Sequence, residues 1–311
     1  MASSIVIVGS CMMDFVCYSP RLPHEGETLH GYKFVTNFGG KGANQCVAAH
    51  KLGGSTTMIA RVGDDLWGDK YISNFKDLGI NHVYVRKTPG ISSGIAQISV
   101  ADSGANQIII VAGANSQLSV NDIQDAKSAI QNANVLVCQL ETSADVAIEA
   151  MKLCKGQIIL NGAPALATYS PELLTLPSIF CVNESEASVF SGVSVHTPQD
   201  AEIALKSFMK KGCQCVIITM GSEGAVFASK DDPTPIHVRA PKKQCVDSTG
   251  AGDSFIGCLA YLLAEYKQLP MNSCVSISCS MATDSCTKPG TQISFPDADI
   301  LKNCMQQYLN F

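Results

Sequence analysis

Short apolar runs alternate with longer stretches of helical period over most of this chain. The first four such segments are 4–9, 43–52, 56–62 and 66–78, of which the first and third are apolar runs. Continuous apolar runs bounded by turns are typical of strands buried on both faces, whereas the longer periodic segments are typical of amphipathic helices. This order of strands and helices predicts an α/β protein with a mostly parallel sheet.

The same alternation continues through the rest of the chain. The expected strands are 135–139, 157–161, 179–182, 215–219 and 225–229, and the expected helices are 120–131, 144–154 and 200–211. Helices that connect parallel strands cover the faces of the sheet. We therefore predict a Rossmann-like three-layer αβα sandwich in which residues 1–311 form one domain.

Two segments, about 12–38 and 94–111, interrupt this rhythm. Both show strand alternation and turn residues but no helical period, so they cannot connect parallel strands of the main sheet. We expect them to form a small β-sheet that covers the site as a lid. Its exposed strand edges favour pairing between two copies of the chain, which predicts a homodimer.

Composition excludes several classes of partner. The chain has 311 residues, 46% of them hydrophobic, and a net charge of −5 without a run of Lys and Arg, so we expect neither nucleic acid nor a membrane as partner. No segment reaches the roughly 18 apolar residues that span a bilayer, and no basic leader precedes the first strand. The 14 cysteines are scattered through apolar runs without a Cys-x-x-Cys pair, which is typical of reduced thiols. We expect a cytoplasmic protein, with the nucleus left open as a second location.

The segment 247–253, Asp-Ser-Thr-Gly-Ala-Gly-Asp, places a glycine-bracketed turn before a helical run. The first N–H groups of a helix lack intrahelical partners and can bind an anion. Gly250 and Gly252 would let a phosphate approach closely, and Asp253 could accept the proton of an attacking hydroxyl. The segment therefore favours phosphoryl transfer, although a capping Asp beside an ordinary turn would have the same sequence.

A second glycine-rich element spans 37–44 and carries Lys41 and Asn44 at the expected start of a helix. It is not a Walker A loop, because no Ser or Thr follows Lys41, and it contains no G-x-G-x-x-G fingerprint. Asp14, Glu141 and Asn161 each come shortly after an expected strand. They would lie at the carboxyl edge of the sheet, where open α/β folds bind ligands, unless they are only turn residues.

Two further clusters suggest a nucleotide site. The segment 183–186, Asn-Glu-Ser-Glu, offers oxygen ligands of the kind that Mg²⁺ prefers, and it is also a plausible capping cluster. The segment 219–224, Thr-Met-Gly-Ser-Glu-Gly, follows a buried strand with glycines and hydroxyls that could line a nucleotide. By itself, that segment indicates only a hairpin.

Two of these segments, in this order and separation, resemble the ribokinase family of carbohydrate kinases. They are 39–44, Gly-Gly-Lys-Gly-Ala-Asn, and 247–253. The resemblance covers nearly the whole chain and implies the ribokinase-like fold with a small β-sheet lid. Gln-Leu-Glu at 139–141, Asn-Gly-Ala-Pro-Ala at 161–165 and Gly-Thr-Gln-Ile-Ser at 290–294 are most similar to members that act on D-ribose. The resemblance thus implies ATP-dependent phosphorylation of D-ribose at its 5-hydroxyl.

The resemblance also implies roles for single residues. Asp253 would be the general base, and the backbone of Gly250, Ala251 and Gly252 would form the anion hole. The residues implied to bind the sugar are Met12, Asp14, Gly40, Lys41, Gly42, Ala43, Asn44, Glu141 and Asp253. Those implied to bind ATP are Asn183, Thr219, Gly221, Ser222, Glu223, Gly224, Gly252, Asp253 and Cys279, with Glu186 organising Mg²⁺ through water. Those implied to hold K⁺ are Asp247, Thr249, Ser285, Lys288, Gly290 and Ser294.

Three positions depart from the family's pattern. Met12 stands where bacterial members have Asn, and Gly162 stands where a Pro is common. Cys279 is assigned to the adenine by counting back from Gly290, but counting forward from Asp253 differs by two residues. Related kinases for adenosine, fructose or deoxyribose would share the anion hole and the base. A non-catalytic sugar or nucleotide sensor is a further alternative, although the intact Asp253 and its glycines argue against it.

Overall fold

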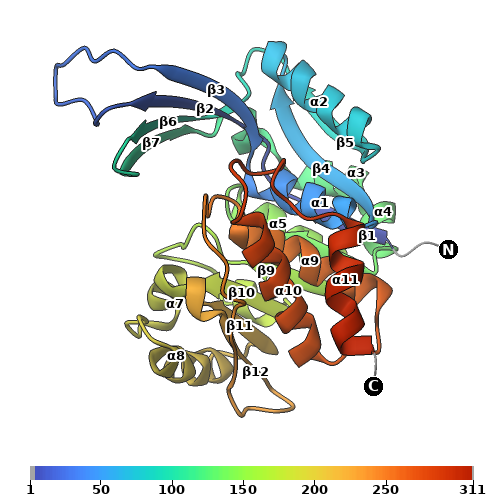
Figure 1. The fold of residues 1–311 in the computed structure, drawn as a ribbon. Helices are drawn as coiled ribbons and strands as arrows, with labels where there is room; N and C mark the ends of the chain where they lie inside the picture. The colour runs from blue at the N-terminus through green and yellow to red at the C-terminus, as the bar shows by residue number, and fades with distance from the viewer. Residues whose placement is uncertain (1–3, 310–311) are drawn as a thin grey trace.

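The computed structural model describes residues 4–309 and contains a large, mostly parallel sheet (Figure 1). Its strands are β1 (Ser4–Val8), β4 (Ser55–Gly63), β5 (Asn81–Thr88), β8 (Val135–Cys138), β9 (Gln157–Asn161), β10 (Ile179–Asn183), β11 (Cys215–Thr219), β12 (Ala225–Ser229) and β13 (Ile236–Val238). They lie in the order β13-β12-β11-β10-β9-β8-β1-β4-β5. Neighbouring strands from β11 through to β5 in this order pair in parallel. Strand β12 pairs antiparallel with both β11 and β13.

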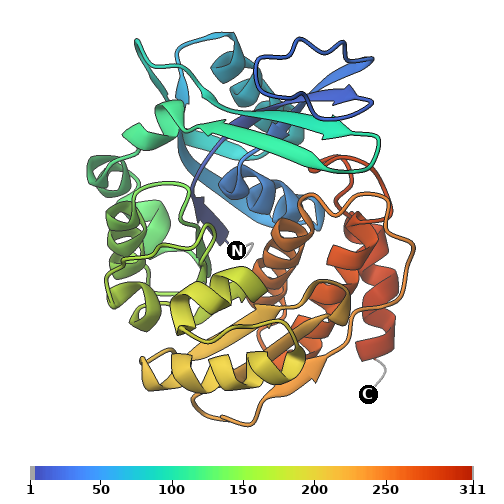
Figure 2. The same ribbon diagram turned by 90° about the vertical axis from the view of Figure 1, so that its left-hand side faces the viewer.

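Helices cover both faces of this sheet (Figure 2). Strand β1 shows why, since Ile5 and Ile7 pack into one apolar cluster, whereas Val6 and Val8 pack into the other. The first face carries α1 (Lys41–Lys51), α2 (Leu66–Leu78), α9 (Ala251–Glu265), α10 (Met271–Ser285) and α11 (Ala298–Leu309). The second carries α3 (Val120–Asp125), α4 (Lys127–Gln131), α5 (Ala144–Leu153), α6 (Glu172–Thr175), α7 (Glu184–Ser191) and α8 (Pro198–Lys210). The predicted three-layer sandwich is confirmed.

Some elements differ from the sequence prediction. The helix expected over 120–131 is interrupted at Ala126, so it forms the two short helices α3 and α4. The edge strand β5 was not predicted, because its alternation of polar and apolar residues leaves only Val85 and Thr88 buried. Helix α10 was also missed, since its run of Ser, Cys and Thr has modest helix propensity. No helix within residues 4–309 is both long enough and apolar enough to cross a membrane.

The two segments expected to form a lid lie in one smaller sheet. Its strands are β2 (Met12–Ser19), β3 (Lys33–Gly39), β6 (Gly94–Ala101) and β7 (Asn106–Val111), in the order β3-β2-β6-β7. This sheet extends away from the main body beside α2 (Figure 1). Phe15 of β2 joins it to the body by packing edge-on against Trp67 of α2, with ring centroids 4.9 Å apart.

Candidate active site

The carboxyl ends of several parallel strands meet at one edge of the large sheet. Strands β1, β8, β9, β10 and β11 are parallel neighbours, so the residues that follow them lie along the same edge. This edge carries Ser10, Glu141, Asn161, Asn183 and Thr219, together with the start of α9. The prediction that polar residues after successive strands converge on one edge is therefore confirmed for Glu141 and Asn161, whereas Asp14 lies within β2 of the small sheet.

Asp253 lies in the first turn of α9 and is only 8% exposed. Its two carboxylate oxygens accept hydrogen bonds from Asn44 Nδ2 and Gln45 Nε2, each at 2.9 Å. Burial raises the pKa of Asp253, while the Lys41 ammonium and the two amide donors oppose that shift. The result is a buried carboxylate of raised basicity that is held in one orientation, as a general base requires.

The two amides that hold Asp253 are themselves held. Gln292 Nε2 donates to Asn44 Oδ1 at 3.0 Å, and Gln139 Nε2 donates to Gln45 Oε1 at 2.7 Å. Because each amide oxygen already accepts a hydrogen bond, its NH₂ group must face the carboxylate. Gln292 belongs to the segment 290–294 that carries part of the family resemblance, but sequence reasoning assigned this residue no role of its own.

The turn before α9 forms a cradle for an anion. Gly250, with φ of 79°, precedes the helix, and Ala251 N donates back to Ser248 O. Among residues 4–309, the N–H groups of Gly252 and Asp253 have no protein acceptor. They border a cavity of about 190 Å³ that Lys41 also lines. Free N–H groups at a helix N-terminus and a nearby ammonium are the groups that bind phosphate.

The two glycines of this turn are needed for different reasons. A Cβ on Gly250 would lie 2.6 Å from Thr291 Cγ2, and its positive φ also disfavours any other residue. A Cβ on Gly252 would meet no atom within 4 Å, although Gly252 lines the cavity. The fold therefore requires glycine at 250, whereas at 252 it has room for a Cβ beside the cavity.

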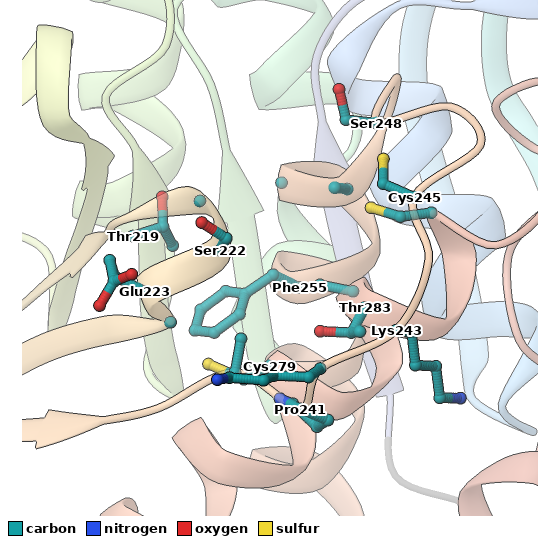
Figure 3. A pocket seen from close by; sticks show the side chains of 18 residues that line it. Thr219, Ser222, Glu223, Pro241, Lys243, Cys245, Ser248, Phe255, Cys279 and Thr283 are labelled. Carbon is teal, nitrogen blue, oxygen red and sulfur yellow. The ribbon is translucent and has the colours of Figure 1, made fainter.

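A larger cavity of about 450 Å³ lies next to the first (Figure 3). Thr219, Ser248, Ala251 and Gly252 line both cavities, so the two adjoin. The expected nucleotide residues Gly221, Ser222, Glu223 and Gly224 line the larger one. An apolar chamber that opens onto a phosphate cradle has the layout that a nucleotide needs.

Cys279 lines the larger cavity together with Phe255 and Thr219 (Figure 3). Counting along the chain left this position ambiguous by two residues. The structure places Cys279 on α10, buried to 4% exposure and facing the same chamber as the 219–224 turn. Cys279 thus lines the same cavity as the other residues expected at the nucleotide, and its contact with a base stays a prediction.

The cluster at 183–186 serves as a helix cap and also lines the smaller cavity. Asn183 Oδ1 accepts from Glu186 N, and Glu186 Oε2 accepts from Asn183 N, each at 2.9 Å. Burial raises the pKa of Glu186, while Lys41 opposes the shift. The capping box engages Oε2, and Glu186 borders the cavity beside Lys41 and Asp253. Both interpretations of this cluster are thus compatible with the structure.

Carboxylates also gather on the side of the small sheet. Asp14 of β2 lies against Gly39, where a Cβ would come within 2.4 Å of Asp14 Oδ2. Burial, together with the charges of Glu141 and Asp253, raises the pKa of Asp14 to about 7. Glu141 Oε2 accepts from Ser10 Oγ and from Lys41 N, and it thereby fixes the start of α1. Sequence reasoning missed Ser10.

Four of the residues expected at the sugar lie around the turn into α1. Ala43 is fully buried in the core, Met12 is 4% exposed, and Gly42 packs so closely on Ser10 that a Cβ would lie 2.6 Å from its N atom. Gly40, with φ of 88°, makes the turn into α1. These four residues shape the entrance to α1, whereas Lys41 and Asn44 extend functional groups to the base.

The residues expected around K⁺ lie in two adjoining loops. Asp247 joins the loops, because its Oδ1 accepts from Thr249 N and its Oδ2 accepts from Gly290 N, each at 2.9 Å.

The other residues expected around K⁺ bond within their own loops. The Ser285 hydroxyl donates to the Ala282 carbonyl, and the Ser294 hydroxyl donates to the Thr291 carbonyl. Lys288 N donates weakly to Ser285 O at 3.5 Å. Within residues 4–309, no group of three or more His, Cys, Asp or Glu could hold a metal. The oxygens that these bonds place in the two loops are hydroxyl and carbonyl oxygens, besides the Asp247 carboxylate.

An oriented, buried carboxylate beside a phosphate cradle and a nucleotide-sized chamber defines a phosphotransferase that activates a hydroxyl group. Comparison with known proteins agrees with this class. The family model described as pfkB family carbohydrate kinase matches residues 2–298, so the chain belongs to the pfkB family of carbohydrate kinases. It is an ATP-dependent carbohydrate kinase.

Individual relatives are similar along nearly their whole length. The ribokinase of Mus musculus is 43% identical over 298 residues, which cover 95% of this chain and 92% of that protein. A deoxyribokinase of Salmonella typhi is 37% identical and covers 95% of this chain and 96% of its own. The solved structure of Arabidopsis thaliana ribokinase complexed with ribose and ATP has a TM-score of 0.88 and 29% identity, and covers 98% of this chain and 99% of its own.

Proposed function

We propose that this kinase transfers the γ-phosphoryl group of ATP to O5 of D-ribose, giving D-ribose 5-phosphate and ADP. The observation that carries the reaction type is Asp253, buried beside the unpaired N–H groups of α9 and oriented by Asn44 and Gln45. The choice of ribose is supported by the mouse relative, which is named ribokinase and is 43% identical.

In this mechanism the side chains position charge and move one proton. Asp253 accepts the proton of the attacking hydroxyl, while the N–H groups of Gly252 and Asp253 and the Lys41 ammonium face the charge that develops on the phosphoryl group. The larger cavity holds the nucleoside part of ATP. Asp14 and Glu141 supply acceptors for sugar hydroxyls.

Oxygen donors at the smaller cavity fit a hydrated Mg²⁺, which would neutralise phosphate charge when bound. Glu186 and Asn183 line this cavity, and Glu186 retains a carboxylate oxygen that the capping box does not use. Glu186 would hold the ion through water, as Mg²⁺ keeps much of its hydration shell.

The substrate is tested by an assay that couples ADP formation to a panel of sugars and nucleosides. We expect the highest kcat/KM with D-ribose, and lower values with 2-deoxyribose, fructose and adenosine. Deoxyribose is the second candidate, because the Salmonella deoxyribokinase is 37% identical over 95% of the chain. A preference for any other acceptor would refute the choice of ribose, and absence of ATP turnover with every acceptor would favour a sensor.

We expect K⁺ to activate the enzyme. Asp247 holds the anion turn and the Gly290 loop together through two backbone N–H groups, and a cation among the surrounding oxygens would fix the same contact. Replacing K⁺ by tetramethylammonium at constant ionic strength should lower kcat roughly tenfold, about 1.4 kcal/mol of barrier. Equal rates in the two salts would contradict this proposal, and a salt titration of the Asp247→Asn variant should show a weakened K⁺ response.

We expect a homodimer that forms through β7. This edge strand of the small sheet exposes four consecutive apolar residues, Ile108, Ile109, Ile110 and Val111, to between 48% and 64%. A second copy that pairs with the edge would cover them. Ile109→Glu should therefore shift the mass measured by light scattering from dimer to monomer. Val83→Glu, at a 68% exposed apolar site on β5, is the matched control, and a monomeric wild-type protein would refute the proposal.

Two further expectations accompany this function. The small sheet would close over bound ribose as a lid, because Asp14 on β2 belongs both to that sheet and to the site. The cytoplasmic location stays a prediction, which fractionation of cells that express the chain would test.

A further inference from the structure

Two cysteine thiols meet at the edge of the larger cavity. Cys245 is exposed, Cys286 is half-buried, and both line that cavity. The two residues lie 41 positions apart in the chain, yet both line this cavity, and the backbone next to Cys245 is hydrogen-bonded to the Cys286 carbonyl. Figure 3 shows Cys245 on the same wall as Ser248 and Lys243. The proposed mechanism of phosphoryl transfer does not use this pair.

The backbone holds the two cysteines together. Val246 N and Asp247 N both donate to the Cys286 carbonyl, at 2.8 and 3.2 Å. Cys286 follows the last turn of α10, and its own N–H donates to Ala282 O. Lys243, two residues before Cys245, forms an ion pair at 2.6 Å with Asp284, which lies on α10. These backbone bonds hold the segment that carries Cys245 beside Cys286, which is the arrangement that a disulfide between the two residues requires.

The remaining described cysteines offer no comparable pair with an exposed member. Cys17, on β2, is the other exposed thiol of residues 4–309, and it lies in the small sheet, far along the chain from the cavity. Two thiols without further ligands also do not make a zinc site, which needs about four. Redox chemistry is therefore the function that this pair can serve.

We propose that Cys245 and Cys286 are a thiol pair that glutathione disulfide oxidises to an intramolecular disulfide, and that this bond weakens nucleotide binding. The exposed Cys245 sulfur, after losing its proton, attacks glutathione disulfide, forms a mixed disulfide and releases one glutathione. The Cys286 sulfur, after losing its proton, then attacks Cys245 and releases the second glutathione. The two protein thiols lose two electrons, and one glutathione disulfide becomes two thiols.

The position of the pair determines its effect. A disulfide shortens the separation of the sulfurs to about 2.05 Å, which draws the 240–249 wall of the cavity towards α10. That wall runs into the turn that carries Ser248 and the anion cradle. The effect on ATP rests on the proposed function of this cavity, whereas formation of the bond does not. If the disulfide weakens ATP binding, then bound ATP must disfavour formation of the disulfide by the same factor.

The first experiment maps the bond. The reduced full-length protein is treated with glutathione disulfide, free thiols are alkylated, and peptides are analysed by mass spectrometry without reduction. We expect a peptide pair joined through Cys245 and Cys286, in the wild type and equally in Cys17→Ser. A lasting mixed disulfide on Cys245 with Cys286 still free would overturn the proposal, as would oxidation of Cys17 alone.

The second experiment measures ATP binding by calorimetry before and after oxidation. We expect the Kd for ATP to rise about tenfold on oxidation and to recover with dithiothreitol, a coupling of about 1.4 kcal/mol. Saturating ATP should slow formation of the bond, and Cys245→Ser and Cys286→Ser should each lose the difference between treated and untreated protein. An unchanged Kd in protein that carries the mapped bond would refute the regulatory effect. Failure to phosphorylate ribose would refute the proposed substrate and leave the mapping result intact.

Discussion

Asp253→Asn should lower kcat by about 10² to 10⁴-fold, because the reaction loses the carboxylate that accepts the hydroxyl proton. The replacement also presents an NH₂ group to Asn44 and Gln45, which already donate to this position. Ribose affinity should change by less than about tenfold, or ~1.4 kcal/mol, since other residues hold the sugar. Steady-state kinetics and ribose calorimetry separate the two quantities.

The pH profile gives the same assignment an independent test. The pKa of Asp253 is raised, so wild-type kcat should fall as the pH drops through that value, where the protonated carboxyl cannot accept a proton. Asp145→Asn is a matched control, because Asp145 also lies in the first turn of a helix but is exposed on α5. The Asp145→Asn variant should retain wild-type turnover and the same fall in kcat at acidic pH. Near-normal turnover in Asp253→Asn would require another base.

Gly252→Ala should lower kcat/KM for ATP roughly 100-fold without loss of stability. The new methyl group meets no protein atom within 4 Å, so the fold accommodates it. Gly252 lines both cavities, so the methyl group would reduce the space for ATP there, and a displacement of about 1 Å can reduce the rate 10²-fold. Coupled kinetics with varied ATP, together with thermal unfolding, would show whether catalysis alone is affected.

Gly250→Ala is the contrasting variant in the same turn. Its methyl group would lie 2.6 Å from Thr291 Cγ2, and its φ of 79° is unfavourable for Ala. We therefore expect a lower Tm, corresponding to about 1 to 3 kcal/mol of lost stability. If Gly252→Ala instead lowered Tm as much as Gly250→Ala, the glycine at 252 would be structural, and the phosphate cradle would lose its main support.

The sequence predicted the central elements well because their causes are local. The apolar runs at 4–9 and 215–219 identified buried strands, and Asp253 was placed in the first turn of a helix by the glycines before it. It failed at β5 and at α10. An edge strand with one solvated face and a helix rich in Ser and Cys are both stabilised by packing against neighbours, which their own residues do not reveal.

The residues of the site also divide into those that the sequence could predict and those that only the packed structure identifies. Asn44 and Lys41 could be predicted from their motif, whereas Gln292 and Ser10 act only through partners distant in the chain. The cap and the ligand interpretations of Glu186 had equal support in the sequence. In the structure the residue caps α7 with one oxygen and borders the cavity, so the alternatives were never exclusive.

The sequence by itself determined the α/β order and the glycine-bracketed turn before α9, because helical period, turn chemistry and capping act over a few neighbouring residues. The role of Asp253 as base is implied by the family resemblance and stays a prediction. Only the tertiary structure decided how the Asp253 carboxylate is oriented, which glycine of the turn has room for a side chain, where Cys279 lies and that the Cys245 segment lies beside Cys286. Each of these depends on atoms far apart in the chain whose distances are fixed only when the sheet and its helices pack together.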